Sequence, residues 1–450
     1  MVSFKKRNIQ DLLQRGETSK YLFNTSWMLS EKLITMGLSL FMSIFVARYL
    51  GAEMFGILSY ALSLSSLFAV ATHLGLQGLV VRELVNQSDQ SGEILGTTLG
   101  MKYIGAFLAL IAFFIISFTS SNNTTELRIL LIFSGTILFK PFEVFDFFFQ
   151  ANVQAKYSSV VRLSSTVFVS VMKIMFIVAG LSVIFFAFGY LIQSIFTVIL
   201  FFICFKWKIN SKHHQWQFNW QRAAKLFRQG WIIMLAAIFS MVYLKMDQVM
   251  LRWMVGIKEV GIYSVAARIS EAWYFIPTTI VASLFPKLID IRASNMKNYK
   301  IKFQQLYNLL FIIAFVIALA LTFSSSFLIS LLFGDEYITA SLILSIHIWA
   351  GVFIFMRAAF SKWILIENAI SFSLITQGIG AVVNILLNFI LIPKYQGVGA
   401  AVATIISYAS ASYFSLLFYK KTRSNFWMMS KAFLSPFYIT KNLLSKHCTK

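Results

Sequence analysis

The chain has 450 residues, of which 58% are hydrophobic and only 12% are charged, and its mean hydropathy is +0.75. Soluble domains of this length do not have such a composition, so the sequence predicts a protein that crosses a membrane many times. The formal net charge is +22. Nucleic-acid binding would require these basic residues on a soluble face, whereas most lie in the connections between apolar runs. We therefore expect no nucleic acid among its partners.

The apolar runs predict an all-α membrane fold with twelve transmembrane helices. A spanning helix needs about 20 mostly apolar residues, because each residue adds about 1.5 Å along the helix axis. Runs of that length cover residues 27–46, 55–81, 97–118, 129–149, 159–179, 183–205, 231–255, 264–289, 304–333, 341–366, 371–392 and 398–419. Residues 1–20 are polar and basic, so we expect the first span to be an uncleaved anchor.

The basic residues of the connections predict the orientation of the chain. With the N-terminus inside, the inner segments carry 28 Lys and Arg, Lys102 and Arg162 among them, and the outer segments carry 4. Lys and Arg concentrate on the cytoplasmic side of membrane proteins. We therefore expect both termini in the cytoplasm.

An internal repeat appears when residue n is placed over residue n+205. The segment GAEMFGILSYA, which begins at Gly51, then aligns with GIKEVGIYSVA, which begins at Gly256, and Gly56 aligns with Gly261. Repeats of this kind favour two six-helix bundles around a central cavity, and a chance match of small residues is the alternative. The predicted parts are an N-terminal bundle at 1–205, a basic cytoplasmic connection at 206–230, a C-terminal bundle at 231–419 and a basic amphipathic cytoplasmic tail at 420–450.

These segments resemble a known family. The resemblance rests on ARYLGAEMFGILSYA from Ala47, LGLQGLVVREL from Leu74, MDQVMLRWMVGIKEVGIYSVAARI from Met246 and YQGVGAAVATIISY from Tyr395. In this order and spacing they are similar to the bacterial O-antigen and polysaccharide flippases of the multidrug/oligosaccharidyl-lipid/polysaccharide exporter superfamily. The resemblance implies a multi-pass protein of the bacterial inner (plasma) membrane that moves a lipid-linked oligosaccharide.

Seven basic residues inside the predicted spans are candidates for an anion path: Lys32, Lys140, Lys173, Lys245, Arg252, Arg268 and Arg357. A charge at the centre of a spanning helix costs about 2.5–3.5 kcal/mol on insertion scales, so such residues usually face a bundle interior or a wet cavity. Lys173 has no acidic residue within a helical turn and is the first candidate for substrate binding. Lys32, Lys140, Lys245 and Arg357 follow, each with a structural role as its alternative. Arg268 is expected to pair locally with Glu271, three residues away.

Polar side chains on two further spans complete the candidate site. Gln377, Asn384 and Asn388 are spaced by seven and four residues and share one helical face, which suits either a sugar-lined cavity or contact between helices. Asp247 corresponds to an acidic position of the family's seventh span, which implies a site for a coupling ion or proton; a salt bridge is the alternative. Glu31, on a polar face of the first span, is the second ion-coupling candidate.

No nucleotide-binding loop, metal cluster or nucleophile triad is recognisable, so the sequence predicts transport rather than an enzyme. We expect no cofactor and a possible link to a proton or sodium gradient. A membrane acyltransferase that uses His347 and a multidrug cation exporter remain alternatives. The leading hypothesis is a flippase for a polyprenyl-diphosphate-linked oligosaccharide, with O-antigen of lipopolysaccharide or capsule as its class. Its expected partners are that substrate, membrane lipid and other polysaccharide-assembly proteins.

Overall fold

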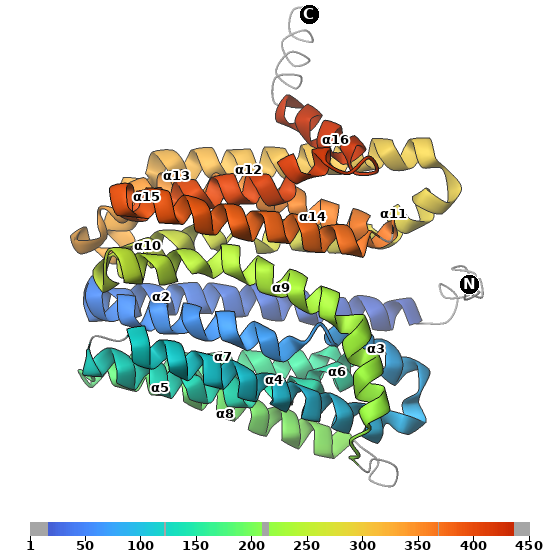
Figure 1. Ribbon diagram of the computed structural model, residues 1–450, viewed down its shortest axis with the longest axis horizontal. Coiled ribbons are helices and arrows are strands. Elements are labelled where there is room, and N and C mark those ends of the chain that lie inside the picture. The colour runs from blue at the N-terminus through green and yellow to red at the C-terminus, as the bar shows by residue number, and fades with distance from the viewer. Residues whose placement is uncertain (1–16, 121–122, 209–215, 368, 436–450) are drawn as a thin grey trace, which may run out of the picture. The chain divides into compact units, whose positions relative to one another are not determined.

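The computed structural model describes residues 17–120, 123–208, 216–367 and 369–435. These residues form helices joined by short turns, and no strand occurs among them, which confirms the all-α prediction (Figure 1). The helices of the first half are α2 Glu17–Ala69, α3 Gln77–Asn86, α4 Ser91–Ser120, α5 Thr124–Phe139, α6 Val144–Ala151, α7 Ala155–Val178 and α8 Val183–Lys208. Those of the second half are α9 Trp220–Met254, α10 Ile257–Glu271, α11 Phe275–Ser294, α12 Met296–Phe333, α13 Ala340–His347, α14 Ala350–Ile366, α15 Ile370–Ser412 and α16 Arg423–Phe433.

Within the described residues, 9 helical segments are long and apolar enough to cross a membrane. Two of them hold a break: α2 contains Gly51 at φ 71°, and α15 contains Gln396 at φ 50°. The predicted fourth span is also interrupted, because the 3₁₀ turn Lys140–Glu143 separates α5 from α6. Each of the twelve predicted spans therefore lies mostly in helix, although some, such as 55–81 and 264–289, cross a turn between two helices. The number twelve itself stays a prediction.

The glycines of the internal repeat occupy equivalent positions. Gly51 and Gly256 both have positive φ, 71° and 139°, and each precedes a new helical stretch. A Cβ atom on Gly56 would lie 2.1 Å from the carbonyl oxygen of Ile257, and one on Gly261 would lie 2.0 Å from that of Ala52. Only glycine permits so close a crossing of two helices. Superposition of the two halves stays a prediction.

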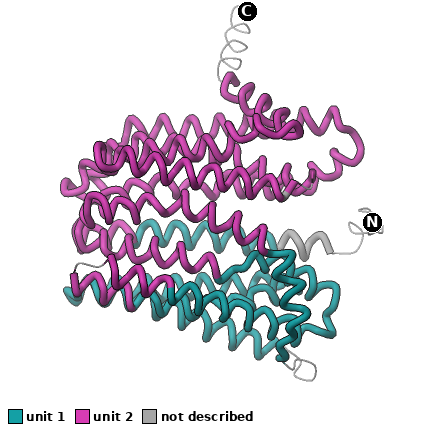
Figure 2. Tube along the Cα trace, in the orientation of Figure 1, with its two compact units in different colours: residues 1–42, 72–111, 132–230 teal, residues 43–71, 112–131, 231–450 magenta. Residues whose placement is uncertain are grey.

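The described chain divides into two compact units, which Figure 2 shows in different colours. Unit 1 comprises residues 1–42, 72–111 and 132–230, and unit 2 comprises residues 43–71, 112–131 and 231–450. Two segments of the first half thus pack with the second half in unit 2. The boundaries of these units differ from those of the predicted bundles at 1–205 and 231–419, and the division into bundles stays a prediction.

The apolar cores reflect the same division. In unit 1, the rings of Phe145, Phe149 and Phe205 gather where α6 meets α8. In unit 2, α11, α12 and α14 enclose a core that includes Phe303, Phe355 and Phe360. These cores hold the helices that carry the polar side chains described next.

Candidate functional site

A buried carboxylate lies at the centre of a polar cluster in unit 2. Asp247 of α9 is only 2% exposed. Its Oδ2 accepts a hydrogen bond from the Tyr263 hydroxyl at 2.7 Å and another from the Thr404 hydroxyl. Its Oδ1 accepts from the side-chain amides of Asn384 at 2.9 Å and Asn388 at 2.6 Å. These five residues form the Asp247 cluster, in which every recorded partner of the carboxylate within the described chain is neutral.

The break in α15 makes this cluster possible. Asn384 and Asn388 are one helical turn apart, so both face Asp247. Thr404 lies 20 residues after Asn384, a separation that would span about 30 Å along an unbroken helix. At Gln396 the backbone leaves helical geometry, with φ 50° and ψ −130°. The chain can therefore return, and both parts of α15 reach the same carboxylate.

The donor set of the Asp247 cluster suits a hard monovalent cation. Carboxylate, amide and hydroxyl oxygens are the ligands that such ions prefer. The Oδ1 atom of Asn388 is buried without a hydrogen-bond partner. The side-chain amides of Asn384 and Asn388 can rotate to direct their oxygens at an ion beside Asp247, because the orientation of an amide is set by its hydrogen bonds. Among the described residues no group of three His, Cys, Asp or Glu could hold a metal ion, so a divalent site of that kind has no counterpart there.

The neighbouring charges of α9 have partners of their own. The Lys245 ammonium pairs with Glu271 at 3.0 Å, so Lys245 and Asp247, two residues apart, contact different neighbours. This corrects the expected Arg268–Glu271 pair, since the Arg268 guanidinium instead lies 4.9 Å from the ring centroid of Phe55. The helix geometry allows both arrangements, and the tertiary contact with α9 decides between them.

Two further candidates of unit 2 lie close to one another. Arg357 of α14 is 8% exposed. Its guanidinium donates to the Thr376 hydroxyl at 2.9 Å, the Ala411 carbonyl at 3.1 Å and the Ser373 hydroxyl at 3.2 Å. Gln377, one residue after Thr376, accepts a hydrogen bond from the Tyr243 hydroxyl at 2.6 Å. In the described chain the recorded partners of Arg357 carry no negative charge.

Unit 1 instead gathers opposite charges. The Glu143 carboxylate is contacted by Lys102 at 3.1 Å, by His73 at 3.3 Å and by Lys140 at 3.5 Å. These residues form the Glu143 cluster. Lys102 is fully buried on α4. It lies near the start of the predicted span 97–118 and was counted with the inner residues, so it was not among the cations predicted inside spans.

The other acidic candidate of unit 1 lies in a second ion-pair cluster. The Arg162 guanidinium binds Asp146 and lies 3.9 Å from Glu31, and Gln150 donates to Asp146 at 2.7 Å. These residues form the Asp146 cluster. Arg162 was also counted with the inner residues, near the start of the predicted span 159–179, and it is part of α7. Glu31 therefore shares a cation with Asp146, unlike Asp247 with its neutral partners.

Lys173 and Lys32 differ in their surroundings. Lys173 of α7 is 9% exposed, and its ammonium lies 4.0 Å from the ring centroid of Tyr190 on α8. A cation over an aromatic face is stabilised by the ring quadrupole. The ion pairs recorded in the described chain do not include Lys173. The side chain of Lys32 is exposed on α2.

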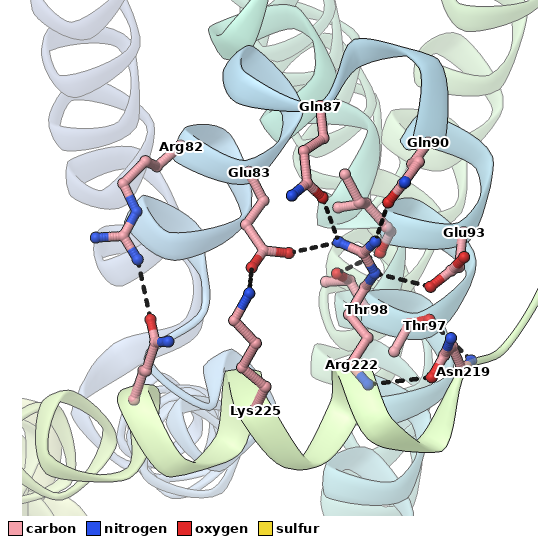
Figure 3. A network of polar contacts seen from close by, with 12 residues as sticks. Arg82, Glu83, Gln87, Gln90, Glu93, Thr97, Thr98, Asn219, Arg222 and Lys225 are labelled. Atoms are coloured by element: carbon pink, nitrogen blue, oxygen red, sulfur yellow. Dashed lines mark hydrogen bonds and ion pairs between the residues drawn. The ribbon is translucent and has the colours of Figure 1, made fainter.

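The connection to the second half is anchored inside unit 1 by Arg222, near the start of α9 (Figure 3). The Arg222 guanidinium contacts Glu83 at 2.8 Å, Glu93 at 2.9 Å, Gln87 at 3.0 Å and also Gln90. Its side chain is 12% exposed. We call these five residues the Arg222 clamp. It joins the first turns of α9 to α3 and α4.

The fold and these polar clusters are those of a helical membrane transporter, and comparison with known proteins gives the family. The chain matches the polysaccharide biosynthesis protein family over residues 21–292 and belongs to that family. It is 25% identical over 243 residues to an uncharacterized membrane protein of Methanocaldococcus jannaschii, covering 52% of this chain and 47% of that protein. It is 28% identical over 186 residues to the probable flippase AglR of Haloferax volcanii, covering 40% of this chain and 38% of that protein. The chain spans less than half the length of these curated relatives.

A solved flippase and a solved multidrug transporter have folds similar to this one. The lipid II flippase MurJ in an inward closed conformation superposes with a TM-score of 0.69 at 17% identity, covering 93% of each chain. An inward-facing multidrug resistance MATE family transporter of the MOP superfamily gives a TM-score of 0.71 at 13% identity, covering 88% of this chain and 96% of that chain. The resemblance to polysaccharide flippases of this superfamily is confirmed, and the chain is a multi-pass membrane protein and not an enzyme.

Proposed function

We propose that this protein moves a polyprenyl-diphosphate-linked oligosaccharide, an O-antigen or capsule repeat unit, from the cytoplasmic to the periplasmic leaflet by alternating access. Membership of the polysaccharide biosynthesis family supports a saccharide-lipid substrate. The similarity to a probable flippase and to the fold of a lipid II flippase supports translocation as the activity. The proposed location is a bacterial inner membrane with both termini in the cytoplasm.

The observation that carries the proposal is the presence of buried cations without acidic partners. Lys173 lies against an aromatic ring, and Arg357 donates only to neutral oxygens among the described residues. Desolvating a diphosphate is costly unless cations or charge-assisted hydrogen bonds replace its water. Lys173 and Arg357 have positive charge to offer, and Lys140 and Lys245 can each exchange a carboxylate partner for a phosphate oxygen. Lys32, which is exposed on α2, is a candidate for the first contact with the diphosphate.

The Asp247 cluster is the proposed coupling site. A carboxylate held by neutral donors keeps its negative charge uncompensated, so a sodium ion or a proton can neutralise it. Binding of that ion would change the hydrogen bonds that join α9, α10 and the two parts of α15. The parts of these helices that carry the cluster belong to unit 2, so the ion can alter how this unit packs. Glu31 is the weaker ion-coupling candidate, because Arg162 already lies 3.9 Å away.

A multidrug cation exporter is the second candidate, because the MATE fold fits the chain as well as the MurJ fold does. A cavity for organic cations needs acidic and aromatic walls. The unpaired buried charges described above include two cations, Lys173 and Arg357, and one acid, Asp247. That balance favours an anionic substrate. The acyltransferase hypothesis is excluded with the enzyme class, and His347 is buried beside Ser270 at 2.9 Å, as a packed histidine is.

The test is transport by the purified full-length chain in liposomes. A polyprenyl-diphosphate-linked oligosaccharide with a fluorescent sugar is placed in both leaflets, and a membrane-impermeant reductant bleaches the outer one. We expect the protein to expose the protected half of the lipid to the reductant, while a fluorescent organic cation is not moved. In the organism that carries the gene, deletion should leave unpolymerised repeat units on the cytoplasmic leaflet. Normal surface polysaccharide after deletion, or cation export in liposomes, would reject the flippase function.

A further inference from the structure

The helix α16 is held firmly on the surface of unit 2. The Tyr307 hydroxyl of α12 donates to the Asn425 side chain at 3.0 Å, and the Gln304 side-chain amide donates to the Met428 carbonyl at 2.9 Å. The ring of Phe426 stacks on Tyr413 with centroids 4.4 Å apart. Met429 and Ala432 are fully buried members of the unit 2 core. These contacts fix which side of α16 faces outward.

The outward side of α16 is basic and aromatic. Arg423, Trp427, Lys431 and Leu434 follow one another at steps of four, four and three residues, so they share one face. All four are exposed, Trp427 to 61%. The preceding turn adds the exposed cations Lys420 and Lys421 and the exposed ring of Phe418. We call the six residues from Lys420 to Leu434 the α16 face: Lys420, Lys421, Arg423, Trp427, Lys431 and Leu434.

The charge of this region is entirely positive. From Phe418 to Ser435 the sequence contains no Asp or Glu. The neighbouring end of α12 carries the exposed residues Lys297, Lys300 and Lys302. With 38 residues, α12 is much longer than the roughly 20 that cross a bilayer, so its basic end extends to the membrane surface or beyond it. The contacts of α16 with Gln304 and Tyr307 place α16 beside that end.

We propose that the α16 face binds the headgroups of anionic phospholipids at the cytoplasmic surface of the membrane. A tryptophan between cations is the pattern of helices that lie at the bilayer interface, where the indole ring enters the headgroup layer. Lys and Arg near the surface attract anionic lipids, and the attraction grows with their number. The occupant is argued from this charge complementarity and from the predicted cytoplasmic position of the tail. The α16 face shares no residue with the Asp247 cluster or with the candidate substrate residues.

The test measures lipid binding to the full-length chain in a neutral detergent. Phosphatidylglycerol or phosphatidylcholine is titrated in, and bound lipid is counted by native mass spectrometry. We expect a preference of about tenfold or more for phosphatidylglycerol, which weakens with added salt. The variant Lys420→Gln, Lys421→Gln, Arg423→Gln and Lys431→Gln should lose most of that preference. Trp427→Ala should weaken the binding of both lipids.

Two controls make the result specific. The variant Arg48→Gln, Arg128→Gln, Lys258→Gln and Lys394→Gln removes the same number of exposed charges from the predicted outer side and should keep the preference. A variant that exchanges Lys and Arg at the four α16 positions keeps the charge and should bind as the parent does. Equal losses in the two neutralised variants would overturn the proposal. So would disulfide-linked dimers of Trp427→Cys in bilayers that contain phosphatidylglycerol, made in a chain in which Cys204 and Cys448 are replaced by Ser, because they would show a second copy covering this face.

Discussion

The candidate charges of the two units have different surroundings. In unit 1, acids and bases meet directly: Glu143 contacts three basic side chains, and Asp146 shares Arg162 with Glu31. In unit 2, Asp247 accepts hydrogen bonds from four neutral groups. Unit 2 has ion pairs as well, Arg252 with Glu126 at 2.7 Å and Lys245 with Glu271 at 3.0 Å, but it also holds Arg357 with neutral acceptors alone.

This difference separates two kinds of polar interior. Ion pairs in a low-dielectric interior compensate one another, and removing one partner leaves the other buried and costly. A charge held by neutral dipoles is oriented but not compensated, so it can still attract an ion of the opposite sign. The ion-pair clusters of unit 1 are therefore expected to respond to charge removal mainly in stability. The Asp247 cluster of unit 2 is expected to respond mainly in ion dependence.

The largest effect should follow from Asp247→Asn. This change keeps the size of the side chain and removes the negative charge, so the neutral neighbours can still hydrogen bond while the ion loses its ligand. We expect flipping driven by a sodium or proton gradient to fall by about 5- to 150-fold, the usual range of coupling between sites. The measurement is the liposome assay with and without each gradient.

The matched control for Asp247 is Asp146→Asn in unit 1, another buried acid. It should lower stability through Arg162 but leave the response to the gradient unchanged. If Asp247→Asn keeps the full gradient response, the Asp247 cluster is a structural network and the comparison between the units loses its functional meaning.

Substitutions of Lys173 test the proposed anion path within unit 1, where this residue is the exception to the ion-pair rule. Lys173→Glu would place like charge against the diphosphate and should lower transport most. Lys173→Ala should lower it by about tenfold, the value of one charge-assisted hydrogen bond. Lys173→Arg should keep partial activity, because the charge survives with a different geometry. Transport is normalised to protein in the membrane, and Lys394→Glu on an exposed segment serves as the control. Parent-like transport by Lys173→Glu would remove Lys173 from the path.

Much of the fold follows from local features of the sequence. The apolar runs located the helices, and the glycine repeat located equivalent helix starts at Gly51 and Gly256, because hydrophobicity and positive φ are properties of single segments. The ends of helices were harder to place. Lys102 and Arg162 lie near the starts of the runs 97–118 and 159–179 and were counted with the inner residues. The helices begin earlier, α4 at Ser91 and α7 at Ala155, so both residues lie well inside them.

The partners of the candidate residues were less predictable. The shared face of Asn384 and Asn388 was visible in their spacing. The runs 371–392 and 398–419 placed a reversal near Gln396. They did not show that Asn384, Asn388 and Thr404 would meet Asp247 across it, or that Tyr263 would take part. Glu271 pairs with Lys245 of α9 and not with Arg268 of its own helix, which is likewise a tertiary contact. Helical spacing predicts which side chains can contact each other on one helix. It does not predict which of them will instead pair with a residue of a neighbouring helix.

Substitutions of Gly56 and Gly261 test how much the close helix crossing contributes to the stability of unit 2. Gly56→Ala or Gly261→Ala would force two backbones apart, because the new Cβ would overlap a carbonyl oxygen of the other segment. We expect a loss of about 3 kcal/mol in the free energy of unfolding, the upper range for overpacking. The control Gly37→Ala has nothing within 4 Å of its Cβ and should be neutral or slightly stabilising. A parent-like unfolding midpoint for Gly261→Ala would show that the helices can separate at little cost.

The smallest effect is expected from the Arg222 clamp, where unit 1 relies on opposite charges near its surface. Arg222→Ala would leave Glu83 with the weaker partner Lys225 at 3.3 Å and would free the polar groups of Gln87, Gln90 and Glu93. We expect a loss of about 2 kcal/mol, because the guanidinium is mostly buried and its hydrogen bonds are charge-assisted.

Arg82, which Figure 3 also labels, provides a contrast to Arg222. It makes one exposed hydrogen bond, to Gln229 at 2.9 Å, so Arg82→Ala should cost less than about 0.5 kcal/mol. The thermal unfolding midpoints of both variants in the same detergent compare the two residues directly. Arg222→Lys should recover only part of the loss, because an ammonium cannot reach four acceptors in the plane of a guanidinium. Equal midpoints for Arg222→Ala and Arg82→Ala would mean that the acidic and amide side chains around Arg222 find water or Lys225 without penalty, and that ion pairing does not hold this part of unit 1 together.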